Sequence, residues 1–265
     1  LGGFFTISAS ENLTSCWSHG KGAACPRCKD RSPAEVIAEV NTLIWEGIEA
    51  GGGGKEFFVW DWGWNNAWAP DLIARLPKEV ALMSVSEWDL PIVRGGIESN
   101  VGEYSLSAVG PGPRATAHWK VARDRGMKTM AKIQANITWE ISSVPYVPAV
   151  ANAAEHARRL REAGVEGIML GWTLGGHPSP NLEVFSAMGS DTTISPEDAM
   201  KQVATDRFGA GLAPAAVKFW QAVSAAYSEY PYHIGTMYNG PQQVGPANLL
   251  WETPTGYNST RMCFT

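Results

Sequence analysis

The fold is indicated by a helix that leads into a strand, in the stretch PAEVIAEVNTLIWEGIEAGGGGKEFFVWD (residues 33–61). Ser32 and Pro33 are typical of a helix N-cap and first helical position, and apolar residues recur on one face up to about Ala50. Four glycines then end the helix, and the aromatic, β-branched run 57–60 predicts a buried strand. The stretch therefore predicts part of a βαβ unit.

The same alternation extends over most of the chain. We expect strands at 4–8, 57–60, 80–85, 127–135 and 165–172, and helices at 33–50, 70–76, 114–125, 147–163, 196–208 and 214–230. Strands that alternate with helices form parallel sheets, either in a doubly wound open sheet or in a (β/α)8 barrel. No repeat or linker divides the sequence, so we expect one α/β domain over residues 1–265.

The residues that follow the strands decide between these two architectures. Each predicted strand ends in a carboxylate or an aromatic residue: Glu11, Asp61, Glu87, Glu140 and Trp172. In a barrel these ends meet at one mouth, where active sites lie. A nucleotide-binding open sheet would need a Gly-rich turn after its first strand, and the sequence contains no G-x-G-x-x-G or Walker A motif. We therefore predict a (β/α)8 TIM-barrel type of fold, represented by its later strands in a chain truncated at both ends.

Two carboxylates are the predicted catalytic pair. If the five strands are the fourth to eighth of the barrel, Glu11 follows strand four and Glu140 follows strand seven, on opposite sides of the mouth. Glycosidases flank the scissile bond with two carboxylates, one as acid and the other as nucleophile or as base acting on water. We expect Glu11 and Glu140 in these roles, while Asp61 and Glu87 hold sugar hydroxyls.

Tryptophan at the strand ends favours a carbohydrate ligand. The sequence has 12 Trp, and sugar rings pack their C–H faces on indole while their hydroxyls need carboxylate and amide partners. Besides Asp61 and Glu87, the predicted substrate-binding residues are Trp60, Trp62, Trp64, Asn136, Trp139, Trp172 and His177. The same residues also suit a carbohydrate-binding barrel without catalysis, in which the tryptophans form a platform. The helical His118 and His156 are expected at the surface or at an interface.

Cys16, Cys25 and Cys28 cluster in one loop. Three interpretations are open: a disulfide with one free thiol, three reduced thiols, or a zinc site with His19 as fourth ligand. A complete structural zinc site usually has two paired ligand sets, and the second pair is missing here. We therefore expect a structural or disulfide role, with no metal and no cofactor. A metal-dependent hydrolase is the weakest function, since the sequence has no H-x-H or H-E-x-x-H motif.

Composition excludes several classes of protein. The formal net charge is -5 and the 21 Lys and Arg residues are scattered, which argues against a nucleic-acid partner. No apolar run approaches the roughly 20 residues that span a bilayer, so no membrane partner is expected. The expected partner is an oligosaccharide or polysaccharide substrate, and the expected location is extracellular or periplasmic. The sequence leaves the oligomeric state open.

Three segments together resemble bacterial glycan-degrading barrels: Ser8-Ala9-Ser10-Glu11-Asn12, the loop Cys16…Cys25-Pro26-Arg27-Cys28, and the helix from Ala34 to Asn41. They look like glycoside hydrolases of the family 163 type and, more distantly, family 20 hexosaminidases. The resemblance covers about 40 residues and implies a barrel that hydrolyses glycosidic bonds. In family 20 an Asp precedes the acid, whereas Ser10 precedes Glu11 here. This departure weakens the case for substrate-assisted catalysis through an N-acetyl group.

Overall fold

The computed structural model describes residues 2–10, 12–141, 144–171 and 176–233. They belong to two compact units, each assembled from three stretches of chain. Unit 1 comprises Leu1–Val85, Pro113–Lys132 and Gly164–Ile168, and unit 2 comprises Ser86–Gly112, Ile133–Ala163 and the chain from Met169 onward. Because these stretches alternate along the sequence, no single linker separates the units.

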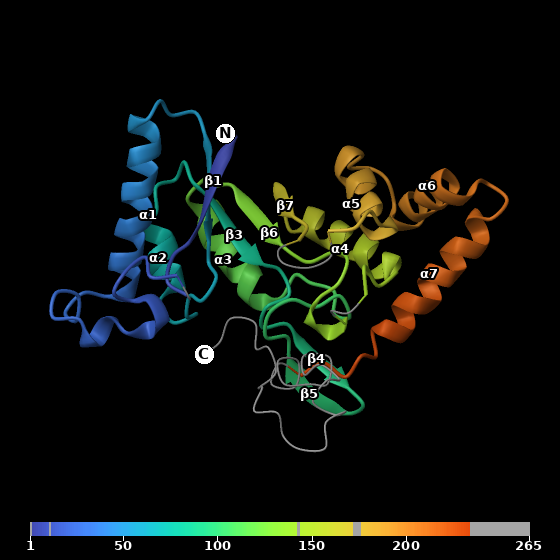
Figure 1. The fold of residues 1–265 in the computed structure, drawn as a ribbon, viewed down its shortest axis with the longest axis horizontal. Coiled ribbons are helices and arrows are strands. Elements are labelled where there is room, and N and C mark those ends of the chain that lie inside the picture. The colour runs from blue at the N-terminus through green and yellow to red at the C-terminus, as the bar shows by residue number, and fades with distance from the viewer. Residues whose placement is uncertain (1, 11, 142–143, 172–175, 234–265) are drawn as a thin grey trace, which may run out of the picture. The chain divides into compact units, whose positions relative to one another are not determined.

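Unit 1 is built on a five-stranded parallel sheet (Figure 1). Its strands are β1 (Gly3–Ile7), β2 (Glu56–Trp60), β3 (Ala81–Val85), β6 (Thr129–Lys132) and β7 (Gly167–Met169), in the order β1-β2-β3-β6-β7. Ile7 is in register with Trp60, and Trp60 with Met83. The carboxyl ends of the strands therefore lie along one edge of the sheet.

The predicted (β/α)8 TIM-barrel fold is wrong. Among the described residues the parallel sheet has five strands, and its order runs from β1 at one border to β7 at the other. The prediction failed because carboxylates and aromatic residues gather at the carboxyl ends of strands in any parallel sheet, open or closed. Closure depends on strand tilt and stagger, which strand-end residues do not reveal.

In the described part of unit 1 there are three α-helices, namely α1 (Pro33–Ala50), α2 (Ala69–Arg75) and α3 (Pro113–Asp124), and two short 3-10 helices, η1 (Ser18–Gly20) and η2 (Gly22–Ala24). The predicted start of α1 is confirmed, because the Ser32 hydroxyl accepts a hydrogen bond from the Glu35 N–H at 3.1 Å. Helix α2 packs against both α1 and α3, and α3 packs on β3 and β6. Trp119 of α3 is fully buried, and its Nε1 donates to the Met130 carbonyl of β6.

The described residues of unit 2 form an antiparallel hairpin, a short 3-10 turn and four α-helices. The hairpin pairs β4 (Pro91–Arg94) with β5 (Ile97–Asn100), and the 3-10 turn η3 spans Trp139–Ile141. The helices are α4 (Val150–Glu162), α5 (Pro180–Ser190), α6 (Pro196–Phe208) and α7 (Ala213–Tyr227). Helix α4 packs against the other three, which gives this unit its own helical core.

The sequence analysis did not predict the hairpin, η3 or α5, although the hairpin and α5 each carry a local signal. Gly95 and Gly96 have positive φ angles of 57° and 78°, as a two-residue hairpin turn requires. Helix α5 begins with Ser179 and Pro180, and the Ser179 hydroxyl accepts from the Leu182 N–H. This is the same N-cap signal that identified α1.

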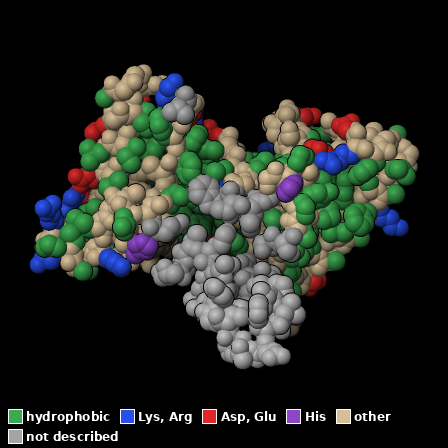
Figure 2. Space-filling model, in the orientation of Figure 1, with side chains coloured by type: hydrophobic (Ala, Val, Ile, Leu, Met, Phe, Trp, Pro, Cys, Tyr) green, Lys and Arg blue, Asp and Glu red, His purple; other side chains and the backbone are tan. Residues whose placement is uncertain are grey.

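The surface carries mixed charge. On the face drawn in Figure 2, Lys and Arg side chains lie singly or in small groups among acidic, apolar and other side chains.

In the part of the chain that the structure describes, no helix combines the length and the apolarity needed to cross a bilayer.

Candidate functional site

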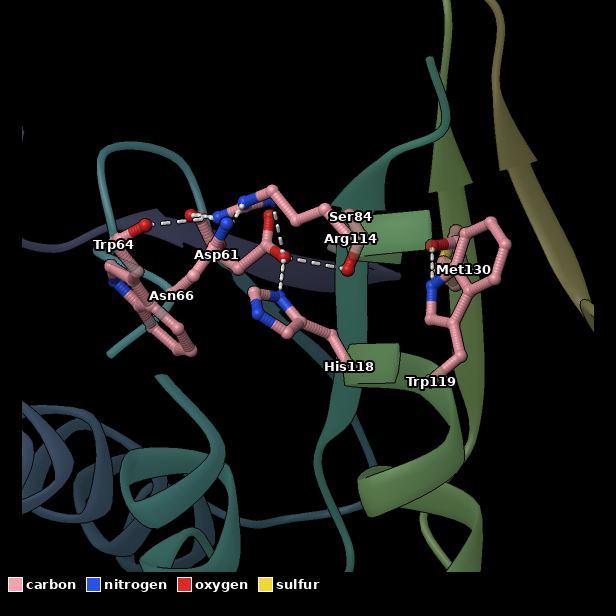
Figure 3. A network of polar contacts seen from close by, with 8 residues as sticks. All are labelled: Asp61, Trp64, Asn66, Ser84, Arg114, His118, Trp119 and Met130. Carbon is pink, nitrogen blue, oxygen red and sulfur yellow. Dashed lines mark hydrogen bonds and ion pairs between the residues drawn. The ribbon is translucent and has the colours of Figure 1, made fainter. Parts of the chain in front are cut away.

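Asp61, the first residue after β2, is at the centre of a buried polar network in unit 1 (Figure 3). Its Oδ2 accepts hydrogen bonds from Ser84 Oγ at 2.7 Å and Arg114 Nη1 at 3.0 Å, and His118 Nδ1 lies 2.7 Å away. Arg114 and His118 are one helical turn apart on α3, so both reach the same carboxylate. The other oxygen, Oδ1, is buried and has no hydrogen-bond partner among the described residues.

The charges in this network compensate each other. Burial by itself raises the pKa of the Asp61 carboxyl, but the positive Arg114 and the hydrogen bonds of His118 and Ser84 outweigh it. The pKa of Asp61 is therefore held below its ordinary value. The carboxylate is ionised at neutral pH and forms a fully buried ion pair with Arg114.

Arg114 also fixes the loop that carries the strand-end tryptophans. Its Nε donates to Asn66 Oδ1 at 2.9 Å, and its Nη2 donates to the carbonyls of Asp61 at 3.0 Å and Trp64 at 3.2 Å. This loop also presents the indole of Trp62. The Trp62 ring lies 5.1 Å from that of Trp60, with 32° between the ring planes.

The three predicted tryptophans of this loop have different exposure. Trp60 and Trp64 are buried, whereas Trp62 is half-buried. Asn65 and Asn66, which follow in the same loop, are exposed. A partly exposed indole backed by a buried one, with amide groups next to it, can pack against the face of a sugar ring and bond its hydroxyls.

Glu140, in unit 2, has a different environment. It is fully buried, and its Oε1 accepts from the hydroxyls of Ser105 at 2.6 Å and Ser107 at 2.5 Å. Its Oε2 accepts from the backbone N–H groups of Leu106 and Ser107, from Thr138 Oγ1 and from Tyr227 Oη. All six donors are neutral, and they occupy both oxygens.

The Tyr227 hydroxyl remains a hydrogen-bond donor to Glu140 at neutral pH. Burial first, and then the negative charge of Glu140, raise the pKa of the Tyr227 hydroxyl, so it stays protonated. Tyr230 adds a bond from its hydroxyl to the Glu140 carbonyl at 2.6 Å. The end of α7 and the loop 105–107 are thus tied to one residue.

The remaining predicted residues of unit 2 lie in two small networks. Asn136 is buried between its neighbours: its Nδ2 donates to the His177 carbonyl at 2.7 Å, and the Ser179 hydroxyl donates to its Oδ1. His177 itself is exposed. The Trp139 Nε1 donates to Glu103 Oε2 at 3.0 Å, and the Trp139 ring packs against the core next to the hairpin.

Glu87, the other predicted ligand, lies beside a serine–histidine pair. Ser86 Oγ is 2.8 Å from His156 Nε2, and Glu87 Oε1 is 3.3 Å from His156 Nδ1. The order of groups matches that of a Ser–His–acid triad. A Cβ added to Gly110 would lie 2.5 Å from Ser86 Oγ, however, so backbone covers the hydroxyl and leaves no room for a substrate.

His156 is buried within unit 2, whereas we expected it at the surface or at an interface. Burial first, and then the positive Arg159, lower the pKa of His156 to about 3. The Glu155 carboxylate favours a charged ring, but it does not offset the cost of burial. The neutral ring shares a hydrogen bond with Ser86 and lies beside Glu87, and all three side chains are buried, which makes this cluster a structural network. His118 is likewise buried and not at the surface.

The three cysteines of unit 1 come together. Cys16, Cys25 and Cys28 are free thiols, and their sulfur atoms all lie within 4.8 Å of one another. Hydrogen bonds from Cys16 and from the backbone N–H groups of Arg27 and Cys28 lower the pKa of Cys25 to about 7. Hydrogen bonds between the Cys16 thiol and the side chains of Cys25 and Cys28 raise the pKa of Cys16 to about 11.

The predicted site residues are thus divided between the units. Asp61 and the tryptophans 60, 62 and 64 belong to unit 1, and Glu87, Asn136, Trp139, Glu140 and His177 belong to unit 2. Glu11 and Trp172 lie outside the described residues. Two pockets in the described part of the chain, one on the hairpin and one between α5 and α6, contain none of these side chains.

Sequence reasoning did not find the residues that hold the carboxylates. Arg114 and His118 partner Asp61 from 53 and 57 residues away. Ser105 and Ser107 partner Glu140 from 35 and 33 residues away. The only local signal was the i, i+4 spacing of Arg114 and His118, which places both on one helix face.

The chain was also compared with known proteins. No protein-family model and no curated protein matches it.

Proposed function

We propose that this protein binds a carbohydrate at the end of β2 and hydrolyses a glycosidic bond. The observation that carries the proposal is the tryptophan loop: a half-buried Trp62 stacked on Trp60 and held by the Asp61–Arg114 network. Rigid aromatic groups bind sugars well because little conformational freedom is lost when the ring stacks.

Asp61 contributes to this proposal in two ways. Its backbone carbonyl and Oδ2 anchor Arg114 and thus the loop. Its Oδ1 is an acceptor without a partner among the described residues, and buried acceptors are normally satisfied by protein, water or ligand. Because Asp61 is fully buried, a buried water that bridges to a sugar hydroxyl would supply the missing donor.

The hydrolytic step requires two carboxylates. We keep Glu11 and Glu140 as the proposed pair, with an oligosaccharide or polysaccharide as substrate. The alternative, a carbohydrate-binding protein without catalysis, is favoured by one observation. The Glu140 oxygens already accept six hydrogen bonds, so a reacting group would have to displace a donor.

Binding can be tested separately from hydrolysis. A panel of α- and β-linked oligosaccharides of glucose, galactose, mannose and N-acetylglucosamine should yield at least one that quenches tryptophan fluorescence saturably. Trp62→Ala should weaken that binding by about tenfold or more, or about 1.4 kcal/mol. Trp45→Ala is the matched control, because Trp45 is also half-buried but lies on α1. Equal affinity in the wild type and both variants would reject the platform.

Hydrolysis is then measured as release of new reducing ends from the bound sugar. Glu11→Gln and Glu140→Gln should each lose turnover while sugar affinity remains, with folding checked by circular dichroism. Unchanged hydrolysis in either variant would remove that residue from the catalytic pair. Saturable binding without product in the wild-type protein would establish the binding function instead.

A further inference from the structure

The cysteine cluster of unit 1 is separate from the tryptophan loop and has a chemistry of its own. Cys16, Cys25 and Cys28 come from the connection between β1 and α1. Cys16 is exposed and the other two are partly buried, so the sulfur atoms face one another at the surface. Within the described residues, this is the group whose His, Cys, Asp or Glu ligand atoms are close enough to hold a metal ion.

The mutual arrangement of the sulfur atoms suits a metal ion better than a disulfide. In a tetrahedral zinc site with Zn–S distances of about 2.3 Å, neighbouring sulfur atoms are roughly 3.8 Å apart. The three sulfurs here lie within 4.8 Å of one another. A disulfide would use two of them and leave the third as an isolated thiol next to the bond. A metal ion uses all three equally.

The loop holds this arrangement without help from a ligand. The Ser18 hydroxyl donates to the Asn12 carbonyl at 2.7 Å, and the His19 N–H donates to the Ser10 carbonyl at 3.3 Å. Trp17 packs on Gly22 so closely that an added Cβ would lie 2.1 Å from its ring. Cys16 is therefore brought to Cys25 across nine positions of sequence by packing of the loop on itself.

The surroundings of the sulfur atoms favour bound thiolates. The backbone N–H groups of Arg27 and Cys28 donate to the Cys25 sulfur. Such donors stabilise negative charge on a metal-bound sulfur and orient it. The loop also carries the exposed cations Lys21, Arg27 and Lys29. They reduce the repulsion that three thiolates would otherwise feel.

We propose that Cys16, Cys25 and Cys28 bind one Zn²⁺ ion, with water as the fourth ligand. The three thiols lose their protons to solvent, and the three thiolates with Zn²⁺ form a site of net charge -1. The ion cross-links the connection between β1 and α1. The site does not depend on the proposed function, because none of its residues belongs to the tryptophan loop or to the carboxylate pair.

The test measures metal and thiols in the same sample of full-length protein, purified under reducing conditions. Elemental analysis should find one zinc per chain, in the wild type and in Cys263→Ser, which removes the fourth cysteine of the sequence. In Cys263→Ser the three thiols should resist a thiol reagent until a chelator removes the ion. Addition of Co²⁺ to the stripped protein should then produce thiolate-to-cobalt charge-transfer absorption.

Variants of the loop identify the ligands. Cys16→Ala and Cys28→Ala should each lower zinc affinity at least tenfold, and Cys28→His should recover part of it because imidazole is also a zinc ligand. His19→Ala, in the same loop, should bind zinc as the wild type does. The proposal is overturned if the stripped protein takes up no Zn²⁺ or Co²⁺, if mass analysis shows a disulfide within the loop, or if Cys263→Ser abolishes binding.

Discussion

Asp61 and Glu140 are both fully buried carboxylates, yet they are stabilised in different ways. Asp61 directly follows β2, whereas Glu140 lies in the 3-10 turn η3, eight residues beyond the end of β6, and not at a strand end as predicted. Asp61 is neutralised by Arg114 and takes its hydrogen bonds on one oxygen, which leaves Oδ1 without a partner among the described residues. Glu140 takes six neutral donors on both oxygens.

The comparison shows that burial alone does not determine what a carboxylate can do. An ion pair concentrated on one oxygen leaves the other without a partner among the described residues. A ring of neutral donors stabilises the whole charge and ties several chain segments to it. Removal of partners should therefore affect the two residues unequally.

The largest effect is expected from Arg114→Met. This change leaves the Asp61 charge buried without its cation, and breaking a buried pair in this way costs about 3–5 kcal/mol. The free energy of unfolding, measured with urea, should fall by that amount. Arg75→Met is the matched control, because the exposed Arg75–Asp71 pair should contribute about 1 kcal/mol or less. Equal losses in both variants would contradict the proposed importance of the buried pair.

Glu140→Gln should have the next largest effect on stability. Glutamine keeps one acceptor oxygen, but its amide N–H groups face donors that the carboxylate accepted. We expect the free energy of unfolding to fall by about 2–3 kcal/mol. The same measurement is needed to interpret the activity test. A loss of turnover indicates a catalytic role for Glu140 only if the variant protein is still folded. A variant as stable as the wild type would show that the donors are not structurally important.

Acid should act on the two units at different pH. The folded-state pKa of His156 is lowered to about 3 from an ordinary 6.5. Below pH 6.5 the unfolded chain binds a proton at His156 and the folded chain does not. The free energy of unfolding should therefore be unaffected by His156 above pH 6.5 and should fall as the pH decreases towards 3. The expected slope is about 1.4 kcal/mol per pH unit. Asp61, whose pKa is also lowered, loses its contribution only below its ordinary value of about 4. Urea unfolding from pH 7 to 4.5 should therefore become less pH-dependent in His156→Gln. An unchanged profile would exclude His156 as the group responsible.

The smallest effect is expected from Tyr227→Phe. It removes one of six donors to Glu140, and the other five remain, so the loss should be about 1 kcal/mol. Thermal unfolding and urea unfolding both measure it. A loss as large as that of Glu140→Gln would mean that the Tyr227 hydroxyl contributes most of the stabilisation of the Glu140 carboxylate.

Much of the secondary structure was predictable because its signals are local. Helices α1 and α6 were predicted with the bounds that the structure has, since each begins with Ser-Pro at the N-cap and ends at glycine. The predicted strand at 127–135 shortens to Thr129–Lys132, although its neighbours to Asn136 are also buried. A run of apolar residues predicts which positions are buried. The length of a strand depends in addition on where the neighbouring strand ends.

The candidate site was predictable only in part. The sequence identified Asp61, Glu140 and the tryptophans around them, because strand-end carboxylates and indoles can be read from the chain. It did not identify Arg114 as the partner of Asp61, or the Ser105–Ser107 loop as the partner of Glu140. Both pairings join residues more than 30 positions apart and depend on how distant segments pack.

The sequence by itself determined the alternation of strands and helices, the residues at the strand ends and the presence of three cysteines in one loop. These follow from periodicity, capping and turn residues within a few positions of each other. Only the tertiary structure decided that five of the described strands form one parallel sheet, that one carboxylate is ion-paired while the other is surrounded by neutral donors, and that the three sulfur atoms meet. Each of these depends on contacts between residues distant in sequence, whose energies no local pattern contains.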